Sequence, residues 1–319
     1  MSSASTSRII ETELVRKHSW ESIRSRVLSL RLEDENGRLL NLKENSNLML
    51  RYLFNKIITR TSEDDPVMIT SESSIAKQQV VEDFDYHRVI NCEPDKFSTL
   101  LETGLIEGKK AVDCIQAYDQ SIIYEAGNGS SAKLRYKKVI YEDIGGLATA
   151  NREYCAEAIA LQIRYTYLRL MTHGLANDYA GLGYKPNDAV EAFASAFNHY
   201  FTRYYSAFPD LETCFGSLGS FFAAELRSEL MMINPPFDLS IMKEMIRRVT
   251  EALDNEGEKT FHLTFPAWLD VKEFMSLETH KYTVKFTIIP KDKTRFIDHM
   301  RGGKVIKPCN ILEVIMTNK

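Results

Sequence analysis

The stretch from Leu230 to Phe237 constrains the fold of this chain more than any other. The apolar run Leu230–Ile233 is typical of a buried strand, and it ends at Asn234-Pro235-Pro236-Phe237, where two prolines stop a strand from continuing. A helical pattern follows at Leu239, Met242, Ile246, Val249 and Leu253. The sequence therefore predicts a strand, a turn and a helix, with Asp238 or Ser240 as the helix cap; Asp238 is interpreted as a cap rather than a catalytic acid.

The turn suits chemistry on an exocyclic amine such as that of adenine, whose lone pair is delocalised into the ring. The side-chain carbonyl of Asn234 and the main-chain carbonyl of Pro235 can each accept one N–H of the amine, which favours the transition state over the flat ground state. Proline fixes the carbonyl direction, and Phe237 offers a face for an extruded base. We interpret Asn234, Pro235, Pro236 and Phe237 as a candidate catalytic motif for amine methylation. The alternative is a Pro-Pro turn that merely ends a strand.

The rest of the second half alternates between strand and helix patterns. Strands are predicted at Val190–Ser195 and Phe261–Phe265, and an aromatic-rich helix is predicted at Ala196–Ser206. Two more strands, Tyr282–Ile289 and Ile311–Thr317, close the chain around Gly302-Gly303. Alternation that finishes in a hairpin predicts an α/β fold with a Rossmann-like methyltransferase core.

The first half reads as mainly helical. Apolar residues at helical spacing predict a helix from Ile9 to about Leu32, and a further helix is predicted from Ala150 to His173, capped by Gly174. On that second helix Arg152, Arg164 and Arg169 could reach outward to phosphates or only to water. The composition changes in the loop around residues 177–188. We expect a helical domain over residues 1–150, which could contact RNA, and the methyltransferase core over residues 151–319.

The charge balance gives no general signal for a nucleic-acid partner. The formal net charge is −4, so any contact with RNA or DNA must come from a local basic patch. The best local cluster of basic and aromatic residues is Lys133, Arg135, Lys137 and Lys138, interleaved with Leu134 and Tyr136. It is a candidate RNA-contacting element, although an exposed amphipathic edge is the commoner meaning of such a pattern.

Several classes of protein are disfavoured. The five cysteines (Cys92, Cys114, Cys155, Cys214, Cys309) form no CxxC pair, which argues against a zinc site and a secreted disulfide framework. The histidines show no ligand spacing, so no metal is expected, and His262 is predicted to face solvent from its strand. No apolar run approaches the length of a membrane span. We expect an intracellular protein, nuclear or cytoplasmic.

Four separated stretches resemble one family in their order and spacing. They are Glu191-Ala-Phe-Ala-Ser-Ala-Phe-Asn198, Tyr205-Ser-Ala-Phe-Pro-Asp210, Phe215-Gly-Ser217 and Asn234-Pro-Pro-Phe237, and Phe265-Pro-Ala-Trp268 is similar as well. Over about residues 150–317 the chain resembles the catalytic region of the phosphorylated-CTD-interacting factor family, the cap-specific adenosine N6-methyltransferases. The resemblance implies a Rossmann-type core, S-adenosylmethionine as methyl donor, and capped RNA with a 5′ adenosine as acceptor.

The resemblance also implies where the donor binds. Its site is expected at Phe193, Ala194, Ser195 and Asn198 after the first core strand, with Asp210 at the matching acidic position and Phe215-Gly216 behind it. Small residues would let the donor approach the backbone, and the N-terminus of the following helix would offer free N–H groups to its carboxylate. An acidic group there could accept from ribose hydroxyls. Trp268 is assigned to the substrate.

Two departures from the family pattern affect these expectations. No GxGxG loop follows the first strand, so Ala194-Ser195-Ala196 must serve instead. The chain has only Trp20 and Trp268, whereas a WW domain carries paired tryptophans. We therefore expect that the family's WW domain is absent and that binding to the phosphorylated polymerase tail is doubtful.

The sequence thus predicts an S-adenosylmethionine-dependent methyltransferase that modifies N6 of adenosine in RNA, at the first transcribed adenosine next to the mRNA cap. One alternative is the same chemistry on DNA or on internal RNA adenine. Another is a catalytically silent RNA-binding partner that keeps the fold without turnover. Whether one or two methyl groups are added stays open.

Overall fold

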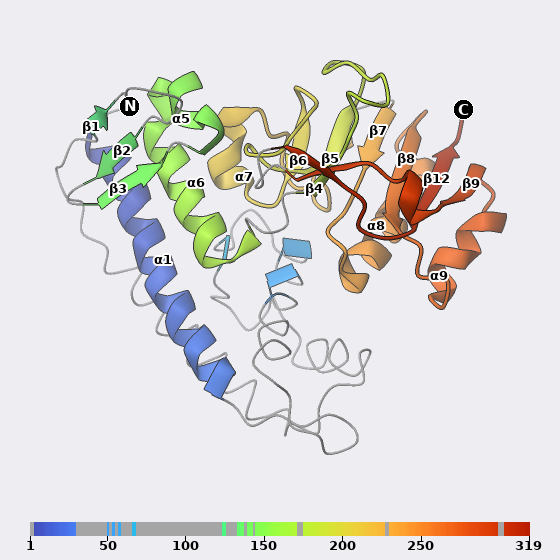
Figure 1. The fold of residues 1–319 in the computed structure, drawn as a ribbon, viewed down its shortest axis with the longest axis horizontal. Coiled ribbons are helices and arrows are strands. Elements are labelled where there is room, and N and C mark those ends of the chain that lie inside the picture. Colours follow the sequence, from blue (N-terminus) through green and yellow to red (C-terminus); the bar gives the residue numbers. More distant parts are fainter. Residues whose placement is uncertain are drawn as a thin grey trace. The chain divides into compact units, whose positions relative to one another are not determined.

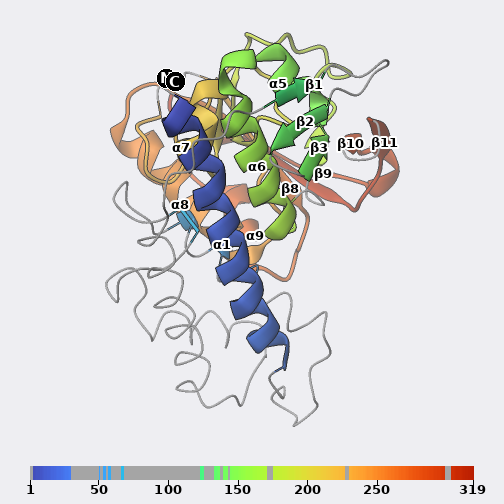
Figure 2. The same cartoon turned by 90° about the vertical axis from the view of Figure 1, so that its left-hand side faces the viewer.

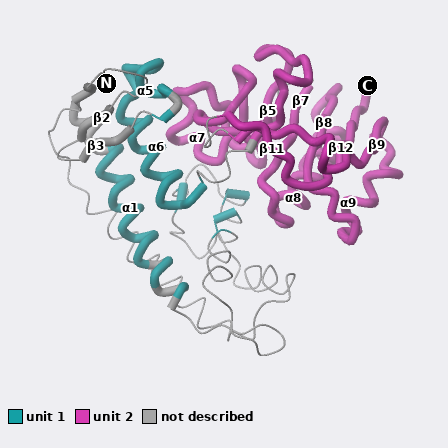
Figure 3. The backbone as a smooth tube through the Cα atoms, viewed as in Figure 1, with its two compact units in different colours: residues 1–170 teal, residues 171–319 magenta. Residues whose placement is uncertain are grey.

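The structure is a computed structural model, and it describes residues 3–29, 50, 53–54, 57–58, 66–67, 123–125, 133–136, 139–142, 144–170, 175–226, 230–298 and 303–319. The chain divides into two compact units, Met1–Leu170 and Met171–Lys319 (Figure 3). Each unit is built around its own elements. In the described part of the chain, no helix combines the length and apolar composition that crossing a membrane requires.

Unit 1 contains two long helices that lie side by side, α1 (Ser3–Ser29) and α6 (Cys155–Tyr167) (Figure 2). Short helical turns precede α6: η2 (Ile144–Gly146), α5 (Leu147–Ala150) and η3 (Arg152–Tyr154). A small antiparallel sheet completes the unit, with β2 (Lys133–Tyr136) between β1 (Ile123–Glu125) and β3 (Val139–Glu142). The helix predicted at Ile9–Leu32 is confirmed over its described residues. The helix predicted from Ala150 to His173 is shorter than expected, and Gly174 lies outside the described residues.

The contact between α1 and α6 corrects one prediction. Arg164 does not reach outward; its side chain is fully buried and forms two hydrogen bonds with the carboxylate of Glu13, at 3.0 and 2.7 Å. The hydroxyl of Tyr167 donates to the same carboxylate at 2.6 Å. Burial alone would raise the pKa of Glu13, but Arg164 outweighs it and holds that pKa below its ordinary value. The arginine therefore joins two helices of unit 1 instead of serving a phosphate.

Unit 2 is organised around a six-stranded sheet whose order is β6-β5-β7-β8-β12-β9 (Figure 1). The strands are β5 (Val190–Ala194), β6 (Tyr204–Ser206), β7 (Leu230–Ile233), β8 (Thr260–Pro266), β9 (Thr283–Ile289) and β12 (Ile311–Thr317). Strands β6, β5, β7 and β8 are parallel to one another, and β12 runs antiparallel to both β8 and β9. A mixed α/β unit with a closing antiparallel pair is what the alternating pattern predicts.

Smaller elements join and flank the sheet. The longest helix of the unit is α8 (Leu239–Asn255), which connects β7 to β8. The short helical pieces are α7 (Pro209–Glu212), η5 (Thr213–Phe215), α9 (Lys272–Met275), η6 (Ser276–Thr279) and η7 (Lys291–Lys293). A second, three-stranded sheet places β10 (Phe296–Asp298) between β11 (Lys304–Ile306) and β4 (Leu175–Asn177).

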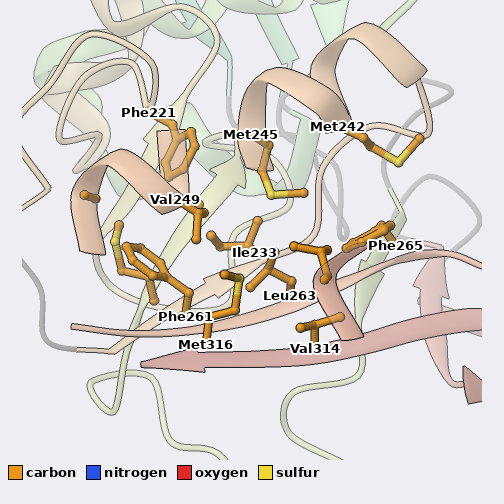
Figure 4. Packing of buried hydrophobic residues seen from close by; sticks show 14 of the residues in the cluster. Phe221, Ile233, Met242, Met245, Val249, Phe261, Leu263, Phe265, Val314 and Met316 are labelled. Atoms are coloured by element: carbon orange, nitrogen blue, oxygen red, sulfur yellow. The ribbon is translucent and has the colours of Figure 1, made fainter. Parts of the chain in front are cut away.

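The main core of unit 2 lies between α8 and one face of the large sheet (Figure 4). Met245 and Val249 of α8 pack against residues from three adjacent strands, among them Ile233, Leu263 and Val314, all of which are fully buried. The period-2 alternation of a strand places these residues on one face and their neighbours on the other. Asp238 begins α8 as predicted, since its carboxylate accepts from the main-chain N–H groups of Ser240 and Ile241.

The helix predicted at Ala196–Ser206 is wrong. The segment forms turns and then enters β6, and its aromatic residues pack together, with the rings of Phe201 and Tyr179 4.9 Å apart. Side chains take the amides that a helix would use: Glu212 accepts from Ala196 N at 2.7 Å, and Glu191 accepts from Tyr200 N at 3.0 Å. Polar side chains that bond the backbone in this way compete directly with helix formation.

Candidate active site at the carboxyl edge of the sheet

The predicted motif of unit 2 lies at the edge of the sheet where the parallel strands end. Ser195 follows β5 and Asn234 follows β7, and these two strands are direct neighbours. The chain passes from β5 to β6 on one side and from β7 to β8 on the other side, so the connections after β5 and β7 run in opposite directions. In open α/β sheets such a switch point forms a crevice at the carboxyl ends of the strands, where ligands bind. The two stretches that the sequence singled out therefore meet at one place.

Asn234 and Pro235 present two hydrogen-bond acceptors at this edge. Asn234 is 7% exposed, and its side-chain oxygen Oδ1 is buried with no hydrogen-bond partner among the residues that the structure describes. Among the described residues no donor meets the main-chain carbonyl of Pro235 either, whereas the carbonyl of Pro236 accepts from Asp238 N at 2.7 Å. A buried acceptor without a partner costs folding free energy, about 1–3 kcal/mol, so its retention calls for an explanation.

The backbone that leads into Asn234 is held from β8. The hydroxyl of Thr264 contacts the carbonyl of Ile233 at 3.3 Å and accepts from the side-chain amide of Asn177 at 2.5 Å. On the other side of the motif, the Asp238 cap fixes the start of α8. The orientation of Asn234 is therefore set by contacts immediately before and after it.

Two aromatic side chains flank the same edge. Phe237 is half-buried, and its ring meets that of Phe296 edge-on at 6.1 Å between centroids. Trp268 follows β8 and stacks on Phe274 at 6.3 Å, also half-buried. Neither ring is fully buried, so each keeps exposed area for a further contact. Their predicted roles toward a base or substrate stay predictions.

The turn after β5 is more closed than the sequence suggested. The amides of Ser195 and Phe197 bond to the side chains of Asn198 and Ser195, at 2.7 and 3.3 Å, and Ala196 N bonds to Glu212. The amides of Asn198 and His199 both bond to the carbonyl of Ser195. No helix begins here, so the predicted set of free N–H donors for a donor carboxylate is absent from this turn. Instead, Ser195 and Asn198 lock the turn, with their side chains 2.9 Å apart.

The remaining predicted donor-site residues lie around this turn. Phe193 packs against the rings of Phe221 and Phe222, while Ala194 is buried at the end of β5. Asp210 is exposed in the first turn of α7, which follows β6. Phe215 ends η5, and Gly216 adopts a φ of 102°, a conformation that favours glycine. The role of these five residues in binding a methyl donor stays a prediction.

Two buried carboxylates escaped the sequence reasoning. Glu191 lies inside β5 and is 1% exposed; burial raises its pKa to about 7, although main-chain N–H groups of Tyr200 and Phe201 oppose the shift. Glu212 is fully buried and fixes Ala196. An acidic residue within the apolar run Val190–Ala194 was the available signal, because a buried acid requires partners or protonation.

His262 does not face solvent as predicted. Its ring nitrogen Nε2 lies 2.8 Å from the carboxylate of Glu313 on β12, and its side chain is only 12% exposed. Lys285 of β9 pairs with the same carboxylate. Burial favours a higher pKa for Glu313, but its bonds to Lys285 and His262 outweigh this and lower it. His262 does alternate with the apolar residues of β8, but the segment around Tyr184 and Tyr200 covers this face of the sheet.

The predicted RNA-contacting cluster belongs to unit 1. Lys133 and Arg135 belong to β2, and Lys137 and Lys138 lie outside the described residues. Within the described part of the chain, no group of three His, Cys, Asp or Glu residues could hold a metal ion.

Comparison with known proteins identifies a matching family model and similar sequences. Residues 179–299 match the family model described as "Phosphorylated CTD interacting factor 1 WW domain". The mRNA (2′-O-methyladenosine-N(6)-)-methyltransferases of Mus musculus and Homo sapiens are each 37% identical to this chain over 81 residues. The aligned stretch is 25% of this chain and 12% of each relative, so the similarity covers a small part of those proteins.

This match corrects the prediction that the WW domain is absent, because the family model found at residues 179–299 is the one that carries that description. The prediction was based on a count of tryptophans, and the matched residues include only Trp268. The doubt about binding to a polymerase tail used the same count and has no support. The match spans β5 through β9 together with α8, most of the large sheet.

Proposed function

We propose that this chain transfers a methyl group from S-adenosylmethionine to N6 of adenosine in RNA. The observation that carries the proposal is a pair of acceptors at the end of β7, Asn234 Oδ1 and the carbonyl of Pro235, to which no described residue donates. An exocyclic amine has two N–H groups, so it complements this pair. The names of the two similar mammalian proteins support the same chemistry.

The strand order supports a Rossmann-like core. Parallel strands lie on both sides of β5, and the sheet ends in the antiparallel strands β12 and β9. The crevice expected between the ends of β5 and β7 lies between the two stretches assigned to donor and acceptor. With donor and acceptor bound as proposed, this arrangement would bring the methyl group and the amine to one edge, as a direct transfer requires.

The residues around the switch point fit a methyl donor. Ala194, Ser195 and Ala196 leave little side-chain bulk at the end of β5, and Asp210 follows β6 as an exposed carboxylate. Phe193, Asn198, Phe215 and Gly216 complete the proposed contact set. When bound, S-adenosylmethionine would supply an electrophilic methyl group on its sulfonium.

The contribution of the chain is positioning and electrostatics. Asn234 and Pro235 would accept from the amine and draw it toward tetrahedral geometry, as charge develops on nitrogen. Thr264 and Asp238 hold the backbone before and after these acceptors, which reduces the reorganisation needed at reaction. Phe237 would stack on the base, and Trp268 would contact the neighbouring part of the substrate.

The finer proposal is that the acceptor is the first transcribed adenosine next to the mRNA cap, with Lys133, Arg135, Lys137 and Lys138 as RNA contacts. The test is methyl transfer from labelled S-adenosylmethionine to capped RNA that starts with A, to the same RNA with a 5′-triphosphate, and to duplex DNA, followed by nucleoside analysis. We expect N6-methyladenosine from the capped RNA in large excess. Equal rates on both RNAs would remove the cap from the proposal, and a preference for DNA would replace the acceptor. Calorimetry would measure donor binding separately. If the donor binds but no substrate is methylated, the alternative of a catalytically silent partner would be favoured.

A further inference from the structure

A cluster of lysines flanks the motif within unit 2. Lys291 and Lys293 belong to η7, Lys304 begins β11, and Lys307 directly follows that strand. All four side chains are exposed, and none forms an ion pair with a described carboxylate. Over the described residues of 291–307, Asp292 is the one exposed carboxylate. A chain of net charge −4 thus carries a concentrated positive surface here.

The lysines lie together because η7 is tied to the end of β11. The ammonium of Lys307 donates to the main-chain carbonyl of Asp292 at 2.5 Å, beside Lys291 and Lys293. Lys304 pairs in register with Asp298 along the hairpin, so it extends the surface away from η7. The neighbouring Arg295 is neutralised by Asp178, at 2.8 Å. We call Lys291, Lys293, Lys304 and Lys307 the lysine surface.

The lysine surface shares the edge of the sheet that carries Asn234. Strand β9 runs in the same direction as β8, since both are antiparallel to β12, and η7 follows the carboxyl end of β9. Asn310 links the two ends: its side chain accepts from Lys291 N at 2.9 Å, and its carbonyl accepts from Ala267 N, directly after β8. At ~4.8 Å between strands, η7 lies about 14 Å along this edge from the end of β7.

A second contact connects the same segment to the motif. Phe296 of β10 touches Phe237 edge-on, so the hairpin that carries Lys304 also packs beside the proposed base-stacking ring. Strand β10 in turn pairs with β4, whose Asn177 bonds to Thr264 next to the motif. The basic segment is therefore a fixed neighbour of the acceptor site.

We propose that the lysine surface binds the RNA phosphates next to the target adenosine and guides the strand toward Asn234. The proposal rests on the proposed function for the identity of the polyanion. Exposed ammonium groups that form no ion pair with a described carboxylate favour phosphates. An RNA strand whose base lies at Asn234 would place its neighbouring phosphates along this edge. Such contacts position RNA and do not read its sequence.

The test is RNA binding by the full chain, measured by fluorescence anisotropy over a range of salt concentrations without methyl donor. The variant Lys293→Gln/Lys304→Gln removes two charges whose side chains have no described partner. The control, Lys281→Gln/Lys319→Gln, also removes two charges, but from the opposite edge, where the parallel strands begin and where Lys281 is paired with Asp254. We expect about tenfold weaker binding for the first variant and a log–log salt slope smaller by about 1.4, at roughly 0.7 per single-strand phosphate contact. The control should bind like the parent.

Parent-like affinity and slope in Lys293→Gln/Lys304→Gln, and in the variant with all four lysines changed, would overturn the proposal. A multiply phosphorylated peptide that binds more tightly than RNA and loses its affinity in the same variant would also overturn it, because the surface would then serve a protein. The binding test does not depend on turnover. If the parent chain methylates no substrate but the variant still binds RNA more weakly than the parent, the lysine surface is supported and the proposed function is removed.

Discussion

The two faces of the large sheet in unit 2 are built from the same strands but from different chemistry. Toward α8, the strands present Leu263, Val314 and Ile233, which belong to a large cluster of buried apolar residues (Figure 4). The opposite face carries the apolar Met232 and also several residues that form hydrogen bonds or ion pairs: His262, Thr264, Glu191, Glu313 and Lys285. Apolar packing on the first face has no preferred direction, whereas the hydrogen bonds and ion pairs on the other face join particular pairs of atoms.

The difference shows how the sheet divides stability from function. Burial of apolar area against α8 is non-directional and stabilises the fold, about 25 cal/mol per Å². Polar groups on the other face stabilise the fold little, because hydrogen bonds to water are lost when they are buried. What they contribute is direction: Thr264, which accepts from Asn177 of β4, contacts the backbone carbonyl directly before Asn234.

The largest effect is expected on the apolar face. Leu263→Ala should lower the free energy of unfolding by about 2–5 kcal/mol, because Leu263 is fully buried between β7 and β12 and the cavity cannot fill. Urea unfolding monitored by circular dichroism would measure it, with exposed Val284→Ala on β9 as the control. A loss below about 1 kcal/mol, within the cost of a conservative swap, would show that this face is loosely packed.

Asn234→Ala tests the edge where both faces end. Turnover should fall about a hundredfold or more, since one acceptor for the amine is lost, while unfolding and donor binding stay near the parent. Asn255→Ala, at the far end of α8, changes the same residue type away from the edge and should leave turnover unchanged. Activity within a few fold of the parent in Asn234→Ala would contradict the mechanism.

Phe237 distinguishes stacking from packing. Phe237→Ala should cost about 1–3 kcal/mol of target-base placement, seen as a lower kcat/KM for RNA. Phe237→Tyr and Phe237→Trp should keep much of the activity because each offers a π face. If Phe237→Leu is as active as Phe237→Tyr, the ring only packs on Phe296 and has no role in stacking.

Thr264→Val tests whether the polar face directs the edge. The change keeps the shape but removes the hydrogen bonds that Thr264 forms with Ile233 O and with the Asn177 amide, which should cost about 1–2 kcal/mol of stability. If Thr264 positions Asn234, turnover should also fall several-fold while the KM for RNA holds. Thr287→Val, exposed on β9, is the control. Parent-like turnover in Thr264→Val would assign the pair to stability alone.

The smallest effect concerns pH. Because burial raises the pKa of Glu191 from 4.5 to about 7, the folded chain favours the protonated carboxyl. Its stabilising contribution is therefore full below pH 4.5 and is lost as the pH rises through about 7. Thermal unfolding from pH 5 to pH 8 should show Tm falling by a few degrees, and Glu191→Gln should flatten that fall. An unchanged pH profile in Glu191→Gln would exclude this assignment.

Local patterns predicted several elements of unit 2 well. The strand before Asn234, the helix begun by Asp238, and the final strand Ile311–Thr317 lie where periodicity and capping place them. The helix predicted at Ala196–Ser206 is wrong because Glu191 and Glu212, two buried carboxylates outside this segment, accept from its amides. His262 failed for a related reason: strand alternation states which face a residue occupies but not what covers that face.

The sequence by itself determined that a strand ends at Asn234-Pro235-Pro236-Phe237, because two prolines and an apolar run act over a few residues. It also determined the α8 pattern and the overall α/β alternation. Only the tertiary structure decided that β5 and β7 are neighbours, that no described residue bonds to the buried Asn234 Oδ1, and that Lys291 and Lys307 share the edge of Asn234. Strand order and burial arise from contacts between residues far apart in the chain, and no local pattern encodes them.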